Sequence, residues 1–158
     1  YGGTAGIFRG HKGSLYEGGI REPAIMAYPG TIPGGQIIDT PCAMFDVFPT
    51  AFEAAGLPLP SHEIDGSSVL DLVTGKDHSP HEQLFWEYGP SQLAVREGDW
   101  KLVLNGREDG EEPFEGAHLS NLASDPSEKV NLADQEGALV TRLSDGVKAW
   151  DAEIGGHP

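Results

Sequence analysis

The chain has 158 residues, a net charge of −15 and 38% hydrophobic residues, with 22 Gly and 12 Pro. This length allows a core that buries about two-thirds of the unfolded surface, and the many turn residues favour short strands and loops over a helix bundle. The acidic charge excludes nucleic acid and anionic membrane surfaces as partners, and no apolar run approaches the roughly 20 residues that span a membrane.

A glycine-rich loop, residues 10–23, carries the densest chemical signal in the chain. Glycines stand close on both sides of Lys12, which leaves little bulk beside its ammonium and makes it a candidate anion ligand. His11 is a candidate proton donor to a leaving group, although an exposed loop histidine is the simpler interpretation. Arg21 follows Glu17 by four residues, and this spacing favours an ion pair that locks the loop over a substrate contact by Arg21.

Residues 24–80 are expected to form a short buried strand and two helices. The apolar run 24–28 lies between prolines, and its length fits a strand better than a helix. Asp46 is expected to cap a helix that ends at Ala55 and packs inward through one face. That face holds Phe48, Phe52 and Ala55. A second, shorter helix is expected over 69–73.

A polar stretch, residues 78–82, separates two parts of different composition, and we place a domain boundary after residue 80. His78 and His81, with acids nearby, invite a metal-binding interpretation. Pro80 breaks helical register between them and no further ligand pattern follows, so a polar linker is favoured.

From residue 83 the pattern is that of antiparallel strands followed by a helix. Strands are expected over 84–88, 93–96, 100–104 and 117–122. In 100–104, the alternation places three apolar side chains on a buried face and Lys101 on the opposite face, which is expected to be wet. The segment that starts at Asp125 is expected to form one helical turn. Apolar residues recur at helical spacing over 137–154, which predicts an amphipathic helix laid on the sheet.

Two further features bear on binding. The aromatic residues Trp86, Tyr88 and Trp100 suit a sugar-stacking platform, but hydrophobic core of the sheet is the favoured interpretation. The acidic loop 108–112 leaves calcium binding open, although no D-x-D-x-D-G pattern supports it.

The glycine-rich loop also carries a family resemblance. Its pattern, G-x-K-G-x-x-Y-E-G-G-x-R-x-P, resembles the second signature of the type I sulfatases, the arylsulfatase-like members of the alkaline phosphatase superfamily. The similarity continues in family order through 28–35, 46–50, 65–66, 94–102 and 125–132. It implies an α/β fold, here an α+β fragment. Residues 1–80 would be the C-terminal part of the alkaline phosphatase-like catalytic α/β domain, and 81–158 a small antiparallel sheet with a packed C-terminal helix.

The resemblance implies that the chain is the C-terminal portion of a sulfuric ester hydrolase. Lys12 would then be the catalytic, sulfate-binding residue, with His11 as a second substrate contact. In this family a cysteine in C-x-P-x-R becomes formylglycine beside calcium or another divalent cation. Cys42 lacks that context, because Met44 and Asp46 stand where the proline and arginine would be. We therefore expect neither cofactor nor metal ligands in this chain, and no activity of the chain alone.

The implied partners are a sulfate ester of an aryl compound or a carbohydrate, and the N-terminal catalytic portion of the same protein. An exposed apolar face would also promote self-association. By resemblance, the compartment is extracytoplasmic, namely periplasmic, secreted or lysosomal. Two alternatives stay open: a phosphodiesterase or phosphonate hydrolase of the same superfamily, and a non-catalytic binding or structural module. The Lys12 loop favours sulfate.

Overall fold

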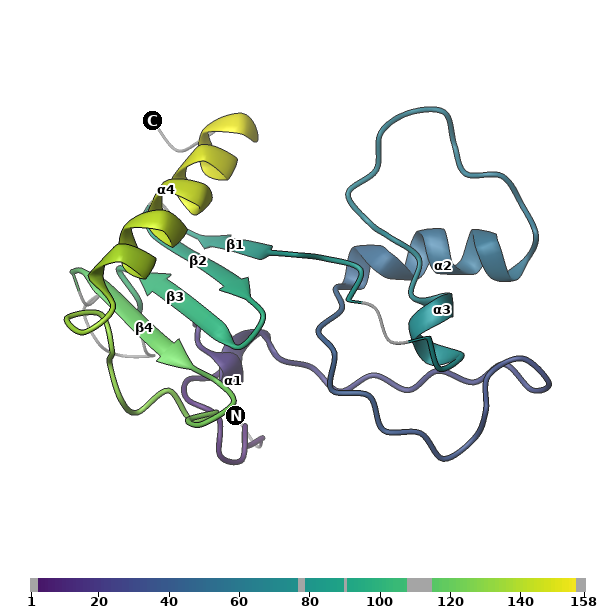
Figure 1. Ribbon diagram of the computed structural model, residues 1–158, viewed down its shortest axis with the longest axis horizontal. Coiled ribbons are helices and arrows are strands. Elements are labelled where there is room, and N and C mark those ends of the chain that lie inside the picture. Colours follow the sequence, from purple (N-terminus) through teal and green to yellow (C-terminus); the bar gives the residue numbers. More distant parts are fainter. Residues whose placement is uncertain (1–2, 77–78, 90, 108–114, 156–158) are drawn as a thin grey trace. The chain divides into compact units, whose positions relative to one another are not determined.

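The computed structural model describes residues 3–76, 79–89, 91–107 and 115–155, which form two compact units (Figure 1). We call them the sheet unit, residues 1–23 with 83–158, and the helical unit, residues 24–82. The sequence grouped the first 80 residues together. In the structure the segment before residue 24 belongs to the sheet unit instead, because it covers one face of the sheet.

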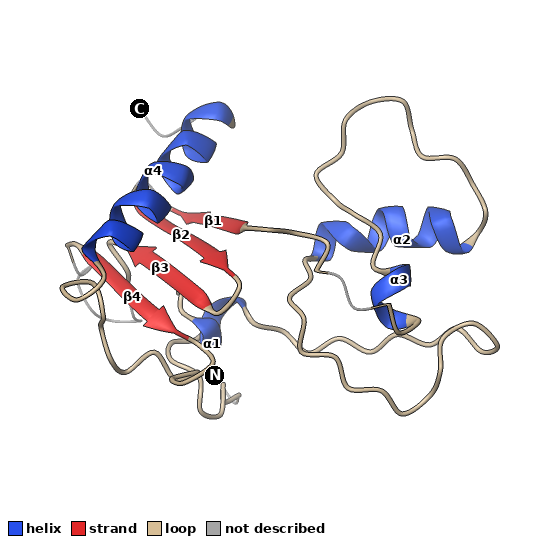
Figure 2. Cartoon of the chain, in the orientation of Figure 1, coloured by secondary structure: helices blue, strands red, loops and turns tan. Residues whose placement is uncertain are grey.

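The sheet unit contains four antiparallel strands arranged in sequence order (Figure 2). They are β1 Leu84–Tyr88, β2 Gln92–Glu97, β3 Trp100–Leu104 and β4 Ala117–Asn121. The predicted strands are confirmed, since apolar and polar residues alternate with the period of a pleated chain. Gly98 forms the turn between β2 and β3 with a φ of 56°, a left-handed conformation that glycine adopts without steric cost.

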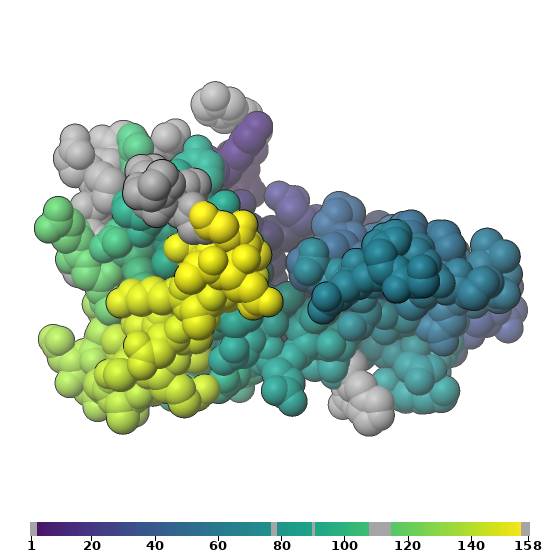
Figure 3. Space-filling view, turned by 90° about the horizontal axis from the view of Figure 1, so that it is seen from above, coloured from purple at the N-terminus to yellow at the C-terminus, as the bar shows by residue number. Residues whose placement is uncertain are grey.

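Helix α4, Gly137–Glu153, covers one face of the sheet, as the helical spacing predicted (Figure 3). Leu143 and Val147 of this helix are fully buried. They pack against one apolar side chain from each of β2, β3 and β4: Val95, Leu102 and Leu119. The Trp150 ring stacks on Phe85 with 5.3 Å between ring centroids. None of the described helices, α4 included, is long and apolar enough to cross a membrane.

The opposite face of the sheet is also covered, so the expectation of a wet face is wrong. Residues 14–20, which include the short helix α1 Glu17–Ile20, lie on this face. Apolar side chains from both layers form a second cluster: Leu15, Tyr16, Ala94 and Val103. Lys101 is therefore fully buried. Alternation along a strand shows which side chains share a face, but not whether a distant segment covers that face.

The helical unit contains the 3-10 helix η1 Met44–Asp46, followed by α2 Val47–Ala54 and α3 Leu70–Val73. Both predicted α-helices are present, but the predicted inward face of α2 is wrong. Phe48 is 44% exposed, whereas Pro49 and Thr50 are buried. Thr50 Oγ1 donates to the Asp46 carbonyl at 2.6 Å and accepts from Val69 N–H at 2.9 Å. These hydrogen bonds, rather than the aromatic side chains, turn that face inward.

Asp46 precedes α2, but its carboxylate does not cap that helix as predicted. It accepts the N–H groups of Ala43 and Ser67 at 2.7 and 2.9 Å. His81 Nε2 lies 2.7 Å from Asp46 Oδ1. The carboxylate thus joins three segments of the helical unit, which accounts for its burial.

Residues 24–28 form no strand, and that prediction is wrong. Ile25 is fully exposed, and Met26 and Tyr28 are 42% and 43% exposed. A strand needs a neighbouring strand to pair its N–H and C=O groups, and the described part of the helical unit contains none.

We expect backbone amides of 24–28 to exchange hydrogen much faster than those of β3, because only the latter pair with strands on both sides. Hydrogen exchange of this chain, followed by mass spectrometry of both peptides, measures the difference. Slower exchange in 24–28 would mean that the stable core lies in the helical unit.

The segment at Asp125 forms a turn instead of the predicted helical turn. Glu128 N–H donates to the Asp125 carbonyl at 3.1 Å, and the Asp125 carboxylate accepts Val130 N–H at 2.8 Å. Glu128 has a φ of 49°, a left-handed conformation that residues other than glycine rarely adopt. The turn directs the Glu128 side chain into the interior, where it is fully buried.

Candidate functional site

Lys12 stands in a tight turn that two glycines shape. Gly10 and Gly13 have φ values of 73° and 94°, which favour glycine over every other residue. Ser14 N–H donates to the His11 carbonyl at 3.0 Å and closes the turn. Lys12 is exposed, and no hydrogen bond or ion pair holds its ammonium among the described residues. His11 is exposed beside it, so the two predicted substrate contacts are neighbours on the surface.

The Lys12 loop, residues 9–18, is closed by a hydrogen bond from Gly18 N–H to the Arg9 carbonyl at 2.7 Å. The base of this loop, where residues 9–10 lie against residue 18, is called the stem here, and little space remains on it. A Cβ atom on Gly18 would overlap the carbonyl oxygen of Gly10, and one on Gly19 would overlap that of Ser14. The Gly-Gly pair of the signature is therefore required by the close approach of two backbone segments.

Glu17 anchors this loop to the sheet. Its carboxylate is 2% exposed, with Oε1 at 2.9 Å from Lys101 Nζ and Oε2 at 3.4 Å from Arg96 Nη1. Arg21 Nη1 lies 3.6 Å from Oε2, which confirms the predicted ion pair. The closest cation, however, is Lys101. The spacing in the sequence indicated the local partner but carried no information about one in a distant strand.

A second buried carboxylate, that of Glu128, shares Lys101. Glu128 Oε1 lies 3.3 Å from Lys101 Nζ, and Oε2 accepts Glu17 N–H at 2.6 Å. Glu128 and Lys101 are both fully buried. Buried charges persist only when paired, so the two carboxylates and the ammonium form one unit, the Lys101 cluster. No pattern in the sequence indicated Glu128, because its turn resembles a helix start.

Burial raises the pKa of the Glu128 carboxyl above its usual value, although the Lys101 ammonium acts in the opposite direction. With a raised pKa, the folded state keeps the Glu128 proton at a pH where the unfolded state has lost it. The contribution of Glu128 to the free energy of unfolding therefore falls as the pH rises from 4.5 through the raised pKa.

We expect Glu128→Gln to gain stability relative to wild type as the pH rises above about 4.5, because glutamine does not ionise. Urea unfolding of both chains between pH 3 and pH 7.5 gives the difference in free energy of unfolding. Glu97→Gln is the matched control, because Arg142 lowers the pKa of Glu97. For this pair, the free energy of unfolding of wild type should increase relative to that of Glu97→Gln as the pH rises toward 4.5. If wild type instead became more stable than Glu128→Gln above pH 4.5, the effect of Lys101 on the pKa of Glu128 would outweigh that of burial.

Arg9, at the first end of the Lys12 loop, also contacts Glu128. Its Nη1 donates to the Glu128 carbonyl at 3.2 Å, and its guanidinium lies 3.9 Å from the centre of the Tyr16 ring. His118 lies edge-on to Tyr16, with Nδ1 at 3.2 Å from Arg9 Nη1. Burial and the Arg9 cation lower the pKa of His118, so its imidazole is neutral at neutral pH and accepts from the guanidinium.

The three aromatic residues considered as a sugar platform do not form one cluster. Trp86 lies on the sheet face that residues 14–20 cover, and Trp100 packs on the face that α4 covers. Tyr88 is 50% exposed, and its hydroxyl would lie 3.6 Å from a Cβ atom placed on Gly13. Tyr88 thus lies beside Gly13, the residue that follows Lys12.

The other candidate positions that the structure describes do not form a cofactor site. Among the described residues, no group of three or more His, Cys, Asp and Glu side chains is placed to hold a metal ion. His78 and the acidic loop 108–112 lie outside the described residues. Cys42 is exposed, but partial desolvation and the nearby Asp46 carboxylate raise the pKa of its thiol, which keeps it protonated and weakly nucleophilic. Because Cys42 also lacks the C-x-P-x-R context, the described residues do not fit formylglycine or calcium.

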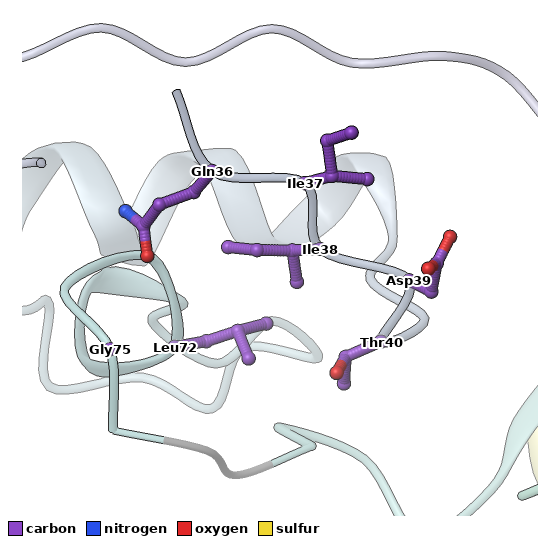
Figure 4. A pocket seen from close by; sticks show the side chains of 7 residues that line it. All are labelled: Gln36, Ile37, Ile38, Asp39, Thr40, Leu72 and Gly75. Carbon is purple, nitrogen blue, oxygen red and sulfur yellow. The ribbon is translucent and has the colours of Figure 1, made fainter. Parts of the chain in front are cut away.

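The helical unit also has a pocket of about 280 Å³ (Figure 4). It is lined by Gln36, Ile37, Ile38, Asp39, Thr40, Leu72 and Gly75. Ile38 and Leu72 face one another across it, and Gln36 Nε2 donates to the Val73 carbonyl at 2.8 Å. The lining contains a carboxylate and no cation, so this pocket does not suit an anionic substrate.

The sequence matches the family described as N-sulphoglucosamine sulphohydrolase, C-terminal, over residues 3–149. The chain belongs to this sulfatase family. Human steryl-sulfatase is 46% identical to this sulfatase domain over 98 residues, which are 61% of the chain and 17% of the relative. Human arylsulfatase A is 38% identical over 150 residues, which are 90% of the chain and 28% of the relative. The domain thus spans less than a third of the length of these curated relatives.

A solved structure of Ps i-CgsB in complex with k-i-k-neocarrahexaose is also similar, with a TM-score of 0.74 and 26% sequence identity. The similarity covers 90% of this domain and 31% of that chain. The predicted fold class, a mixed α/β fragment with a small antiparallel sheet and a packed C-terminal helix, is confirmed. The relatives favour a sulfatase over the phosphodiesterase, phosphonate hydrolase and non-catalytic alternatives.

Proposed function

We propose that this domain supplies Lys12 to the sulfate group of a sulfate ester in a complete sulfuric ester hydrolase. The observation that carries the proposal is an exposed ammonium in a glycine turn whose stem is fixed by the buried Glu17. The two glycines hold the turn in backbone conformations of positive φ, and this turn presents the ammonium at the surface, where an anion can approach it. The fixed stem reduces the conformational entropy that binding removes.

The chemistry follows from the charge of the substrate. A sulfate monoester bears one negative charge, and departure of the leaving group builds more on the bridging oxygen. An ammonium that donates a charge-assisted hydrogen bond to a sulfate oxygen stabilises this developing charge. We assign His11, the exposed neighbour of Lys12, as a second substrate contact.

We assign the nucleophile and the metal to an N-terminal catalytic portion of the complete protein. Formylglycine and calcium, or another divalent cation, belong to that portion because the described residues of this domain do not fit them. Large exposed apolar side chains in the helical unit support a contact with that portion. They include Ile25, Ile37 and Met44, which are 100%, 91% and 85% exposed. Without that portion the same side chains would favour self-association.

The substrate class is an aryl or carbohydrate sulfate. The oligosaccharide in the Ps i-CgsB complex supports a carbohydrate, and the names of the curated relatives support steryl and aryl esters. We assign the complete enzyme to an extracytoplasmic compartment, periplasmic, secreted or lysosomal, on the family relationship.

We expect the 158-residue chain alone to be inactive, because its single cysteine, Cys42, lacks the C-x-P-x-R context of the aldehyde-hydrate nucleophile. Incubation of the purified chain with a chromogenic aryl sulfate tests this, with the complete enzyme as the positive control. Turnover by the isolated chain that is lost on substitution of one of its own residues would contradict the proposed division of the site.

A further inference from the structure

We infer that Glu128 is a positioning residue for Lys12, an inference that rests on the proposed role of Lys12. Both ends of the Lys12 loop contact this one residue. At the first end, Arg9 Nη1 donates to the Glu128 carbonyl at 3.2 Å. At the other end, Glu17 N–H donates to Glu128 Oε2 at 2.6 Å. The stem of the loop is thus fixed against a residue that lies more than a hundred positions away in the sequence.

The backbone conformation of Glu128 indicates that its side chain makes contacts that offset a strained turn. A non-glycine residue at a φ of 49° is strained relative to an ordinary conformation. Glycine would make the same turn without this strain. A glutamate there also places a carboxylate in the interior, where Lys101 Nζ is 3.3 Å away. The strain and the desolvation are offset by contacts, and those contacts hold the loop.

The alternative is that Glu128 only stabilises the fold. The main apolar core, between α4 and the sheet, lies on the opposite face and does not involve Glu128. If Glu128 is removed, Lys101 still pairs with Glu17 at 2.9 Å, and the buried charges stay balanced. Loss of the Glu128 carboxylate should therefore free the stem of the Lys12 loop while the sheet and α4 stay folded.

A double-mutant cycle in the complete enzyme separates these roles. The four proteins are wild type, Lys12→Ala, Glu128→Ala and the double variant, compared by kcat/KM for one chromogenic sulfate ester. We expect Glu128→Ala to lower kcat/KM about tenfold or more, because small displacements of a catalytic group are costly. In the Lys12→Ala background the same change should cost less than about twofold, since a positioning residue acts through its target.

Two controls make the test specific. Glu128→Gln keeps an oxygen that accepts Glu17 N–H, so it should retain kcat/KM within about threefold of wild type. Glu97→Ala removes a carboxylate from an ion pair with Arg142, in the same sheet but away from the loop, and should leave kcat/KM unchanged. Equal losses from Glu128→Ala in both backgrounds, or no loss in either, would overturn the inference.

Hydrogen exchange in the same proteins gives a readout that does not depend on activity. In Glu128→Ala, amides of 10–19 should exchange faster while those of β3 and α4 keep their wild-type rates. Unchanged exchange in 10–19 would overturn the positioning role. A normal kcat/KM for Lys12→Ala, combined with faster exchange of 10–19 in Glu128→Ala, would instead refute the proposed function and leave the anchoring of the loop intact.

Discussion

Lys12→Ala in the complete enzyme should lower kcat/KM for a sulfate ester on the order of a hundredfold or more. The substitution removes a charge-assisted hydrogen bond at the reacting group, a loss of about 2–4 kcal/mol by comparison with other single electrostatic stabilisers. Because Lys12 is exposed and makes no ion pair among the described residues, the melting temperature should stay at the wild-type value. Steady-state kinetics and thermal unfolding of the same preparation give both quantities.

Arg21→Ala is the matched control, because it also removes a cation from the signature. Arg21 lies 3.6 Å from the Glu17 carboxylate, and its guanidinium stacks on Phe8 at 4.6 Å from the ring centre. Its loss should therefore act through stability, and activity should fall only as far as the melting temperature does. A Lys12→Ala enzyme with near-normal kcat/KM would remove the one catalytic role assigned to this domain.

Lys101→Ala should reduce the free energy of unfolding by about 3–5 kcal/mol, the usual cost of removing one partner from a buried ion pair. The substitution leaves the carboxylates of Glu17 and Glu128 buried without their shared cation. That is a large fraction of the roughly 5–15 kcal/mol that stabilises a domain. Urea unfolding of the 158-residue chain measures the change.

Lys76→Ala provides the contrast, because its ion pair with Asp71 is exposed. Solvent screens such a pair, so the urea midpoint should not change measurably. If Lys101→Ala behaved like Lys76→Ala, the Lys101 cluster would not be holding the N-terminal segment on the sheet.

The sheet and α4 were predictable because their signals are local. Period-two alternation in β3 and helical spacing from Leu139 to Trp150 each depend on residues only a few positions apart. The exposed Lys12 turn was predictable for the same reason, since two glycines at fixed offsets define it. The Glu17–Arg21 ion pair likewise follows from spacing along a single turn.

The Lys101 cluster was not predictable, because its members come from three distant segments. The sequence pattern predicted that Lys101 lies on the solvent-facing side of a strand. It predicted that Glu128 lies at the start of a helical turn. Only the folded chain brings residues 14–20 over that face and converts a surface lysine into a buried one. Pattern reasoning assigns a polar residue to solvent by default, and a buried ion cluster is where that default fails.

In the helical unit the sequence predicted burial for apolar side chains that are in fact exposed. Apolar side chains at 24–28 and at Phe48 suggested burial, yet the structure leaves them exposed. In this unit the buried positions are set by polar contacts, as with Thr50 and Asp46. Apolar residues predict that a surface is covered somewhere in the protein, and we propose that the N-terminal catalytic portion covers these.

The most direct test of the central claim is a crystal structure of the complete enzyme with inorganic sulfate, the product of ester hydrolysis. We expect the ammonium of Lys12 to lie about 2.7–3.2 Å from a sulfate oxygen, the range of a charge-assisted hydrogen bond. A sulfate bound in the active site more than about 5 Å from Lys12 would contradict the claim that this domain contributes the sulfate-binding lysine.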